Sequence, residues 1–324
     1  MLPPILDVAR LIAGIAILYL GAEWMIRGSA ALARTFGVKP LVIGLTVVAY
    51  GTSAPELAVS TKAALDNVQP IAIGTVIGAC AANISLILGL TALISPPTID
   101  VRLIKREVPI LLGSALAVPL CLRDGYLSRN EGIALVACAI LFTVVTLTVS
   151  AKELDQPTTA RAASAAEGGA ASPPSRSRAW AIAMSAIGVG LLVFGSNQFV
   201  SGARGVAAEL DMSERMLGLT VVAIGTSLPE LIASIMAASR GHSALAIGSV
   251  IGSNLLNVFL VLGIVAYLRP ISFGERMHAV DGMGLVGITL LAIITLRGER
   301  RVSRLEGGLL VLAYVAFVIA AAAF

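Results

Sequence analysis

The sequence contains one segment twice. Residues 44–56 read GLTVVAYGTSAPE and residues 218–230 read GLTVVAIGTSLPE, so eleven of the thirteen positions are identical at an offset of 174. Each copy places a glutamate, Glu56 or Glu230, directly after a proline within a long apolar stretch. A carboxylate at membrane depth is costly and marks a functional site by default. Two of them, each beside a helix breaker and related by a repeat, indicate a cation site between two halves of a transporter.

The composition places the chain in a membrane. Of its 324 residues, 57% are hydrophobic and 13% are charged, with a mean hydropathy of +0.92, whereas soluble proteins carry about 25% charged residues. Apolar runs long enough to cross a ~30 Å hydrocarbon core recur along the whole chain. They cover residues 5–33, 40–65, 70–95, 107–122, 131–150, 179–209, 216–238, 244–268, 279–296 and 306–323. We therefore expect an all-α membrane protein with ten transmembrane helices.

A polar segment divides the chain into two halves. Residues 151–178 are rich in Ala, Ser, Gly and Pro, which is typical of a flexible linker. The linker leaves five spans in residues 1–150 and five in residues 179–324. Because five is odd, the second half enters the membrane from the opposite side, and a sequence repeat becomes two inverted five-helix repeats.

The basic residues predict the orientation. Fifteen of the 23 lysines and arginines fall on the side that holds the linker and the loops after spans one, three, seven and nine. The positive-inside rule makes this side cytoplasmic, so both termini are expected outside the cytoplasm. The net charge is +4, and the basic residues lie between spans and form no single patch that would bind nucleic acid. We expect a bacterial or archaeal cell (inner) membrane protein, with a monomer as the working hypothesis.

The motif at residues 51–56 combines a helix breaker with oxygen-bearing side chains. Pro55 has no amide hydrogen and its ring clashes with the carbonyl four residues earlier, so the helix should kink or unwind. Carbonyls freed in lipid need partners, and a bound cation is one. Thr52 and Glu56 are four residues apart on one face, and Ser53 lies one turn before Glu56. The second half repeats the arrangement with Gly225, Thr226, Ser227, Pro229 and Glu230.

A second repeated element follows each motif. Gly74, Gly78 and Asn83 match Gly248, Gly252 and Asn257 at the same offset. The glycines suit close helix packing, but an amide in hydrocarbon needs a polar partner. We therefore expect Asn83 and Asn257 to line a polar site, with Ser253 on the same face as Asn257.

The donors in these motifs are hard oxygens. Two carboxylates with carbonyls and hydroxyls suit Ca²⁺, which takes 6–8 oxygen ligands. No His or Cys cluster argues for zinc or copper, and neither a phosphate loop nor a nucleophile triad argues for an enzyme or a cofactor. Outside the motifs, Glu23 and Arg27 are spaced for a local ion pair. Glu107 and Asp281 are expected at the membrane interface, as is His278.

The two motifs, each followed by a glycine-rich span that ends in an amide, resemble the alpha repeats of the cation/calcium exchanger superfamily, and specifically the prokaryotic sodium/calcium exchangers. The resemblance covers nearly the whole chain. It implies a calcium site made by Glu56, Glu230 and the carbonyls of Thr52 and Thr226. It also implies sodium sites that share the glutamates and add Ser53, Ser227, Ser253 and the carbonyls of Ala49 and Ala223. Spans one and six would slide across the other eight as a gating pair.

Two positions depart from the family pattern. The chain has Ala79 where these exchangers usually carry a serine, and Asn257 where they usually carry an aspartate. One sodium site therefore lacks a hydroxyl, which leaves the coupling ion and its stoichiometry open. The expected function is secondary antiport of Ca²⁺ against Na⁺, with the lipid bilayer and these ions as the partners. A calcium/proton or other cation exchanger on the same fold is the alternative, and a passive cation channel is a weaker one.

Overall fold

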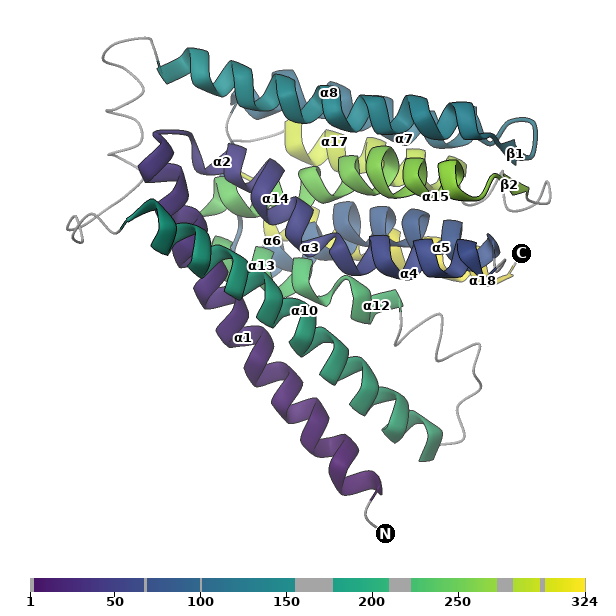
Figure 1. Ribbon diagram of the computed structural model, residues 1–324, viewed down its shortest axis with the longest axis horizontal. Coiled ribbons are helices and arrows are strands. Elements are labelled where there is room, and N and C mark those ends of the chain that lie inside the picture. Colours follow the sequence, from purple (N-terminus) through teal and green to yellow (C-terminus); the bar gives the residue numbers. More distant parts are fainter. Residues whose placement is uncertain are drawn as a thin grey trace.

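The computed structural model describes residues 3–66, 69–99, 101–154, 177–209, 223–272, 282–297 and 301–323. Nearly all of them are helical (Figure 1). The first half contains α1 (Pro3–Phe36), α2 (Pro40–Ile43), η1 (Gly44–Val48), α3 (Ala49–Thr52), α4 (Ala54–Leu65), α5 (Gln69–Ala81), η2 (Ala82–Ile87), α6 (Leu88–Ile94), α7 (Val101–Cys121), β1 (Tyr126–Leu127) and α8 (Arg129–Leu154). The second half contains α10 (Arg178–Glu209), α12 (Ala223–Thr226), α13 (Leu228–Ser239), α14 (Ser243–Leu256), η4 (Asn257–Leu262), α15 (Gly263–Leu268), β2 (Ile271–Ser272), α17 (Met283–Arg297) and α18 (Arg304–Ala323).

These elements coincide with the ten predicted spans. Within the described ranges, five helices are long and apolar enough to cross a membrane by themselves, and the bent pair from Pro40 to Leu65 makes a sixth. The helix of span four, α7, begins six residues before the predicted start at residue 107. As a result Glu107 lies inside the helix, in its second turn, and is only 2% exposed, so it is buried against protein, while its position relative to the membrane interface stays a prediction. Arg106 forms an ion pair with it. Asp281 and His278 lie outside the described residues.

Contacts between loops agree with ten alternating spans. The strands β1 and β2 pair antiparallel and join the connection after span four to the connection after span eight. An isolated bridge between Thr98 and Arg301 joins the connections after spans three and nine. Connections that touch must lie on the same side of the membrane, and ten alternating spans give each pair the same side. Most of the predicted linker, residues 155–176, lies outside the described residues, so the domain boundaries stay a prediction.

The internal repeat is visible in the breaks of the helices. Ser53 separates α3 from α4 with φ −79° and ψ 2°, and Ser227 separates α12 from α13 with φ −91° and ψ 4°. The bounds of α3 and α4 match those of α12 and α13 at the offset of 174. In Figure 1, α4 extends to the right of the centre and α13 extends to the left, as expected for inverted repeats.

The long helices α1 and α10 form a separate tilted pair (Figure 1). Their glycines meet across the repeat: Gly14 faces Gly195, and Gly21 faces Gly188. At each of these positions a Cβ atom would lie 3.0 Å or less from backbone of the other helix. Small residues thus let the two backbones approach closely, as in other membrane helix pairs.

Candidate functional site

The broken helices place both glutamates at helix N-termini. Pro55 and Pro229 occupy the first turns of α4 and α13, where the missing amide hydrogen is not needed. Glu56 and Glu230 therefore lie in the first turn of their helices, and the helix dipole favours a negative charge there. The predicted kink is confirmed, with the break at the serine two residues before each proline. Span two, from Pro40 to Leu65, bends by 42° at its break.

A contact from α10 shows the effect of the second proline. Because Pro229 has no amide hydrogen, it cannot bond to the carbonyl of Gly225, four residues earlier. That carbonyl instead accepts a hydrogen bond from the hydroxyl of Ser196 on α10. The corresponding residue of the first half is Ala22, which has no hydroxyl. The α10 helix is thus tied to the second break by a contact that α1 cannot make at the first.

The predicted side chains form a buried polar cluster that is not satisfied internally. Thr52, Glu56, Glu230, Ser253 and the two asparagines are each 0% exposed, and Ser53 and Ser227 are 4% exposed. Ten buried side-chain oxygen and nitrogen atoms in this cluster have no hydrogen-bond partner, and they belong to Ser53, Glu56, Asn83, Ser227, Glu230 and Asn257. Buried polar groups are almost always paired, so this many unpaired atoms together indicate a binding site.

The two halves meet within this cluster. The carboxyl groups of Glu56 and Glu230 lie close enough to interact electrostatically. The hydroxyl of Thr52 lies 3.3 Å from that of Ser253 on α14. The side chain of Ser227 lies near Glu56, and that of Thr52 near Glu230, so a hydroxyl of each half lies near the other half's carboxylate. The structure thus brings together residues that are 171 to 201 positions apart in the sequence.

The second repeated element packs directly against the first. A Cβ at Gly248 would lie 2.6 Å from the carbonyl oxygen of Leu41, and one at Gly252 would lie 2.8 Å from Ala49. The predicted close helix packing is confirmed for these two glycines. Ser253 follows Gly252 on α14, so this contact holds Ser253 beside Thr52.

Both asparagines lie where the helix changes its winding. Asn83 lies in the π-helical segment η2, and Asn257 is the first residue of the π-helical segment η4. A π-helical turn widens the helix and often occurs at functional sites. Each asparagine is thereby held in the buried cluster with its amide group unpaired.

Three further positions were predicted to act through their backbone carbonyls. Ala49 is fully buried at the start of α3. Ala223 and Thr226 are the first and last residues of α12, and Thr226 is partly exposed. All three lie within one turn of the broken helix ends, and the carbonyl of Ala49 accepts a hydrogen bond from the amide of Ser53 at 3.0 Å. No group of three or more His, Cys, Asp or Glu residues occurs in the described ranges, so the site's donors are mainly neutral oxygens.

A contact outside the motifs joins α1 to α13. The predicted ion pair of Glu23 and Arg27 is present, but Glu23 also pairs with Arg240, which follows the C-terminus of α13. Sequence spacing could not reveal this partner, since it is 217 residues away. His242 lies two residues after Arg240 in the sequence, and burial together with the charges of Arg34 and Arg240 lowers the pKa of its imidazole.

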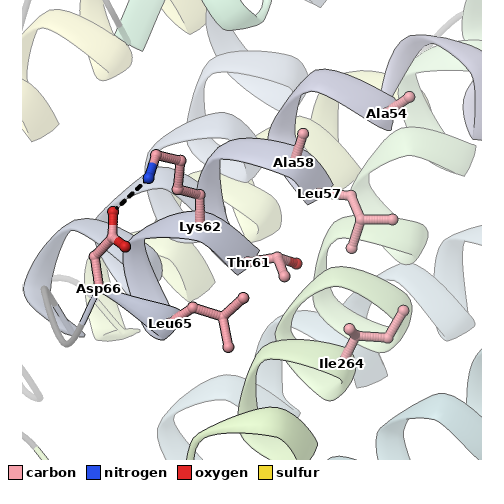
Figure 2. A pocket seen from close by; sticks show the side chains of 8 residues that line it. All are labelled: Ala54, Leu57, Ala58, Thr61, Lys62, Leu65, Asp66 and Ile264. Atoms are coloured by element: carbon pink, nitrogen blue, oxygen red, sulfur yellow. Dashed lines mark hydrogen bonds and ion pairs between the residues drawn. The ribbon is translucent and has the colours of Figure 1, made fainter.

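A surface groove beside α4 is separate from this cluster. It has a volume of about 650 Å³ and is shown in Figure 2. Its lining consists of Ala54, Leu57, Ala58, Thr61, Lys62, Leu65 and Asp66 with Ile264 of α15. These α4 residues lie on the helix face opposite Glu56, because successive residues are about 100° apart around the axis. The groove is mostly apolar and none of the predicted site residues line it.

Comparison with known proteins agrees with this architecture. The model of the family "Sodium/calcium exchanger protein" matches residues 6–148 and 180–323. The chain is 36% identical to the inner membrane protein YrbG of Escherichia coli over 82% of this chain and 81% of YrbG. It is 30% identical to the sodium/calcium exchanger MaX1 of Methanosarcina acetivorans over 95% of this chain and 96% of MaX1.

A solved structure has the same fold. The sodium-calcium exchanger NCX_Mj, soaked with Na⁺ and Sr²⁺, superposes with a TM-score of 0.83 at 31% identity, over 97% of this chain and 98% of NCX_Mj. The match extends over both halves, so it includes all ten transmembrane helices and both repeats. The chain is therefore an integral membrane protein and belongs to the sodium/calcium exchanger family of cation antiporters.

Proposed function

We propose that this protein exchanges Ca²⁺ against Na⁺ across the membrane by alternating access. The observation that carries the proposal is the pair of buried carboxylates, Glu56 and Glu230, surrounded by unpaired hydroxyl and amide groups. Two carboxylates neutralise one divalent cation, and the neutral oxygens complete a shell of the 6–8 ligands that Ca²⁺ prefers. The relatives MaX1 and NCX_Mj bear the name of sodium/calcium exchangers, which supports the same ion pair here.

The proposed ligands are those that the family resemblance implies. Calcium takes the two glutamates with the backbone carbonyls of Thr52 and Thr226. Sodium ions share the glutamates and add oxygens from residues near the two breaks, namely Ser53, Ser227, Ala49 and Ala223, and from Ser253 on α14. Asn83 and Asn257 line the site. Since calcium and sodium share both carboxylates, they compete for one site, and this competition couples the two fluxes.

Alternating access requires a part that moves as a unit. The pair of α1 and α10 suits this role because its glycine contacts join the two helices more closely than either joins the remaining helices. Ser196 on α10 bonds to the break beside Glu230, so a displacement of the pair acts directly on the site. The pair would slide across the other eight spans and open the site to one side at a time.

Proton coupling is the second candidate, and one residue favours it. Ala79 is buried and supplies a methyl group where its repeat mate, Ser253, supplies a hydroxyl. A sodium ion at this position has one ligand fewer, whereas a proton needs only a carboxylate. A passive channel is a third candidate, and the paired broken helices argue against it, because they are a feature of transporters.

Flux measurements distinguish these candidates. Purified protein in proteoliposomes should take up calcium-45 when a sodium gradient opposes the calcium, and should take up little with a proton gradient alone. Glu56→Gln and Glu230→Gln should each abolish uptake, because a buried charge left without its partner costs about 3–5 kcal/mol. Asp66→Asn is the matched control, since this carboxylate lies exposed at the end of α4 and should be replaceable without loss.

The outcomes separate the proposals. Uptake that follows the proton gradient and ignores sodium would replace sodium by protons as the coupling ion. Uptake without any opposing gradient would indicate a channel. Near-normal uptake by a well-folded Glu56→Gln protein would refute the site itself.

The arrangement in the cell is part of the proposal. We place the protein in the inner membrane of a prokaryotic cell with both termini outside the cytoplasm and the linker at residues 151–178 inside. A cysteine at Ser172 should then react with an impermeant thiol reagent only from the cytoplasmic side.

A further inference from the structure

Each glutamate begins a buried stripe that continues along its helix. On α4 the buried residues are Glu56, Ser60, Ala63 and Ala64. On α13 the corresponding stripe contains Glu230, Ser234, Ala237 and Ala238, each at the offset of 174. Residues four apart lie on the same helix face, so Ser60 and Ser234 lie directly beyond the glutamates. Both serines are buried, with exposures of 0% and 1%.

The hydroxyls of these two serines have no hydrogen-bond partner. Several other buried hydroxyls bond to a carbonyl of their own helix, among them Thr46 to Val42 at 2.6 Å, Ser114 to Leu111 at 2.8 Å, and Thr289 to Leu285 at 2.8 Å, although those of Thr91 and Ser249 are also unpaired. That local bond is the usual solution for a hydroxyl inside a helix. Ser60 and Ser234 have not adopted it, in either half of the molecule. A group that is buried and unpaired calls for an explanation such as a water or an ion.

The two serines lie on opposite sides of the site. A helix rises about 1.5 Å per residue, so each serine lies about 6 Å along the helix from its glutamate. Because α4 and α13 extend from the centre in opposite directions (Figure 1), the two serines lie beyond their glutamates in opposite directions. The residues that follow on each stripe are alanines, whose side chain is a single methyl group.

We propose that Ser60 and Ser234 are outer ligands of the transported cation, one for each side of the membrane. The inference rests on the proposed function and adds a step to it. A hydrated cation that approaches the glutamates must exchange water for protein oxygens. A hydroxyl one turn before the carboxylate binds the cation, or its last water, while this exchange takes place. Since each serine serves one route, each affects the apparent affinity from one side only.

The test compares the two sides of the membrane. Ser60→Ala and Ser234→Ala are expressed in cells without their own exchanger, and calcium-45 uptake is measured in right-side-out and in everted vesicles. Each variant should raise the half-saturating calcium concentration about three- to tenfold in one vesicle type, as expected for one lost neutral oxygen contact. The two variants should affect opposite vesicle types, and Ser60→Thr, which keeps the hydroxyl, should remain close to the parent.

A second measurement excludes a merely structural role. Removal of a buried hydroxyl without a partner should leave the melting temperature unchanged or raise it, because no hydrogen bond is lost. Ser114→Ala is the matched control: it removes a hydroxyl that is paired within its own helix, so it should lower the melting temperature slightly and leave calcium affinity unchanged.

The result identifies which proposal fails. Unchanged affinity from both sides in both serine variants, with Glu56→Gln inactive, would overturn the outer ligands and leave the central site intact. Equal effects from both sides would also overturn them. Transport by Glu56→Gln would instead refute the proposed site.

Discussion

The glycine contacts between α1 and α10 can be tested with a single methyl group. A Cβ atom at Gly188 would lie 2.3 Å from the backbone nitrogen of Met25 and 2.6 Å from its Cα. Backbone atoms cannot turn aside as a flexible side chain can. Gly188→Ala must therefore push α1 and α10 apart. A Cβ atom at Gly190, on the same helix, would meet no heavy atom within 4 Å, so Gly190→Ala is the matched control.

The magnitude follows from these distances. Ordinary van der Waals contact begins at about 3.4 Å, so the helices must separate by about 1 Å at Gly188. Overpacking of this kind costs about 1–3 kcal/mol. Alanine is the better helix former by about 1 kcal/mol, so the net loss for Gly188→Ala is up to about 2 kcal/mol. Gly190→Ala gains the helix preference alone and should be neutral or stabilising.

Thermal unfolding in one lipid or detergent system measures the difference. At about 2–4 °C per kcal/mol, Gly188→Ala should melt several degrees below Gly190→Ala. Its calcium exchange should also slow, because a separated pair no longer moves as a unit. If Gly188→Ala melts at the same temperature as Gly190→Ala, the close approach of α1 and α10 is not what the structure describes, and the reasoning fails.

Two further predictions concern single side chains. Arg240→Gln should destabilise the protein by about 1 kcal/mol, a modest loss because the arginine is half-exposed. The loss should exceed that of Arg27→Gln, because Arg27 pairs with Glu23 within α1 whereas Arg240 joins α1 to the end of α13. Thermal unfolding of both variants measures the difference, and equal losses would contradict it. Ala79→Ser should lower the sodium concentration for half-maximal calcium exchange by a factor of about two to ten, because it restores one oxygen ligand. An unchanged sodium titration would show that position 79 contacts no sodium ion and would favour proton coupling.

The architecture could be predicted from the sequence because the internal repeat is visible in the sequence itself. The offset of 174 predicted that Pro55 and Pro229 would break equivalent helices, and the breaks occur at Ser53 and Ser227. The physical reason is local, since a proline removes one helical hydrogen bond and crowds the carbonyl four residues earlier, although α7 continues through Pro109 and Pro119. The ten spans could be predicted for a similar reason, because hydrocarbon requires an apolar run of fixed length.

Other features depended on distances that no spacing encodes. The α7 helix begins earlier than its apolar run, because a helix can continue through charged residues that reach water or pair with each other, and Glu107 is thereby buried beside Arg106. Arg240 reaches Glu23 from another span, and Ser196 reaches the carbonyl of Gly225 in the same way. Ser60 and Ser234 could be read as ordinary small residues until their burial and their unpaired hydroxyls were known.

The sequence by itself therefore determined the inverted repeat, the broken helices and the residues that carry charge into the membrane, because each depends on local covalent structure or on the thickness of a bilayer. The tertiary structure alone decided how the halves meet. It placed Glu56 near Glu230, Thr52 beside Ser253, and α1 against α10, because the packing of small residues sets which helix faces come together. A cation site made from two halves exists only once that packing is complete.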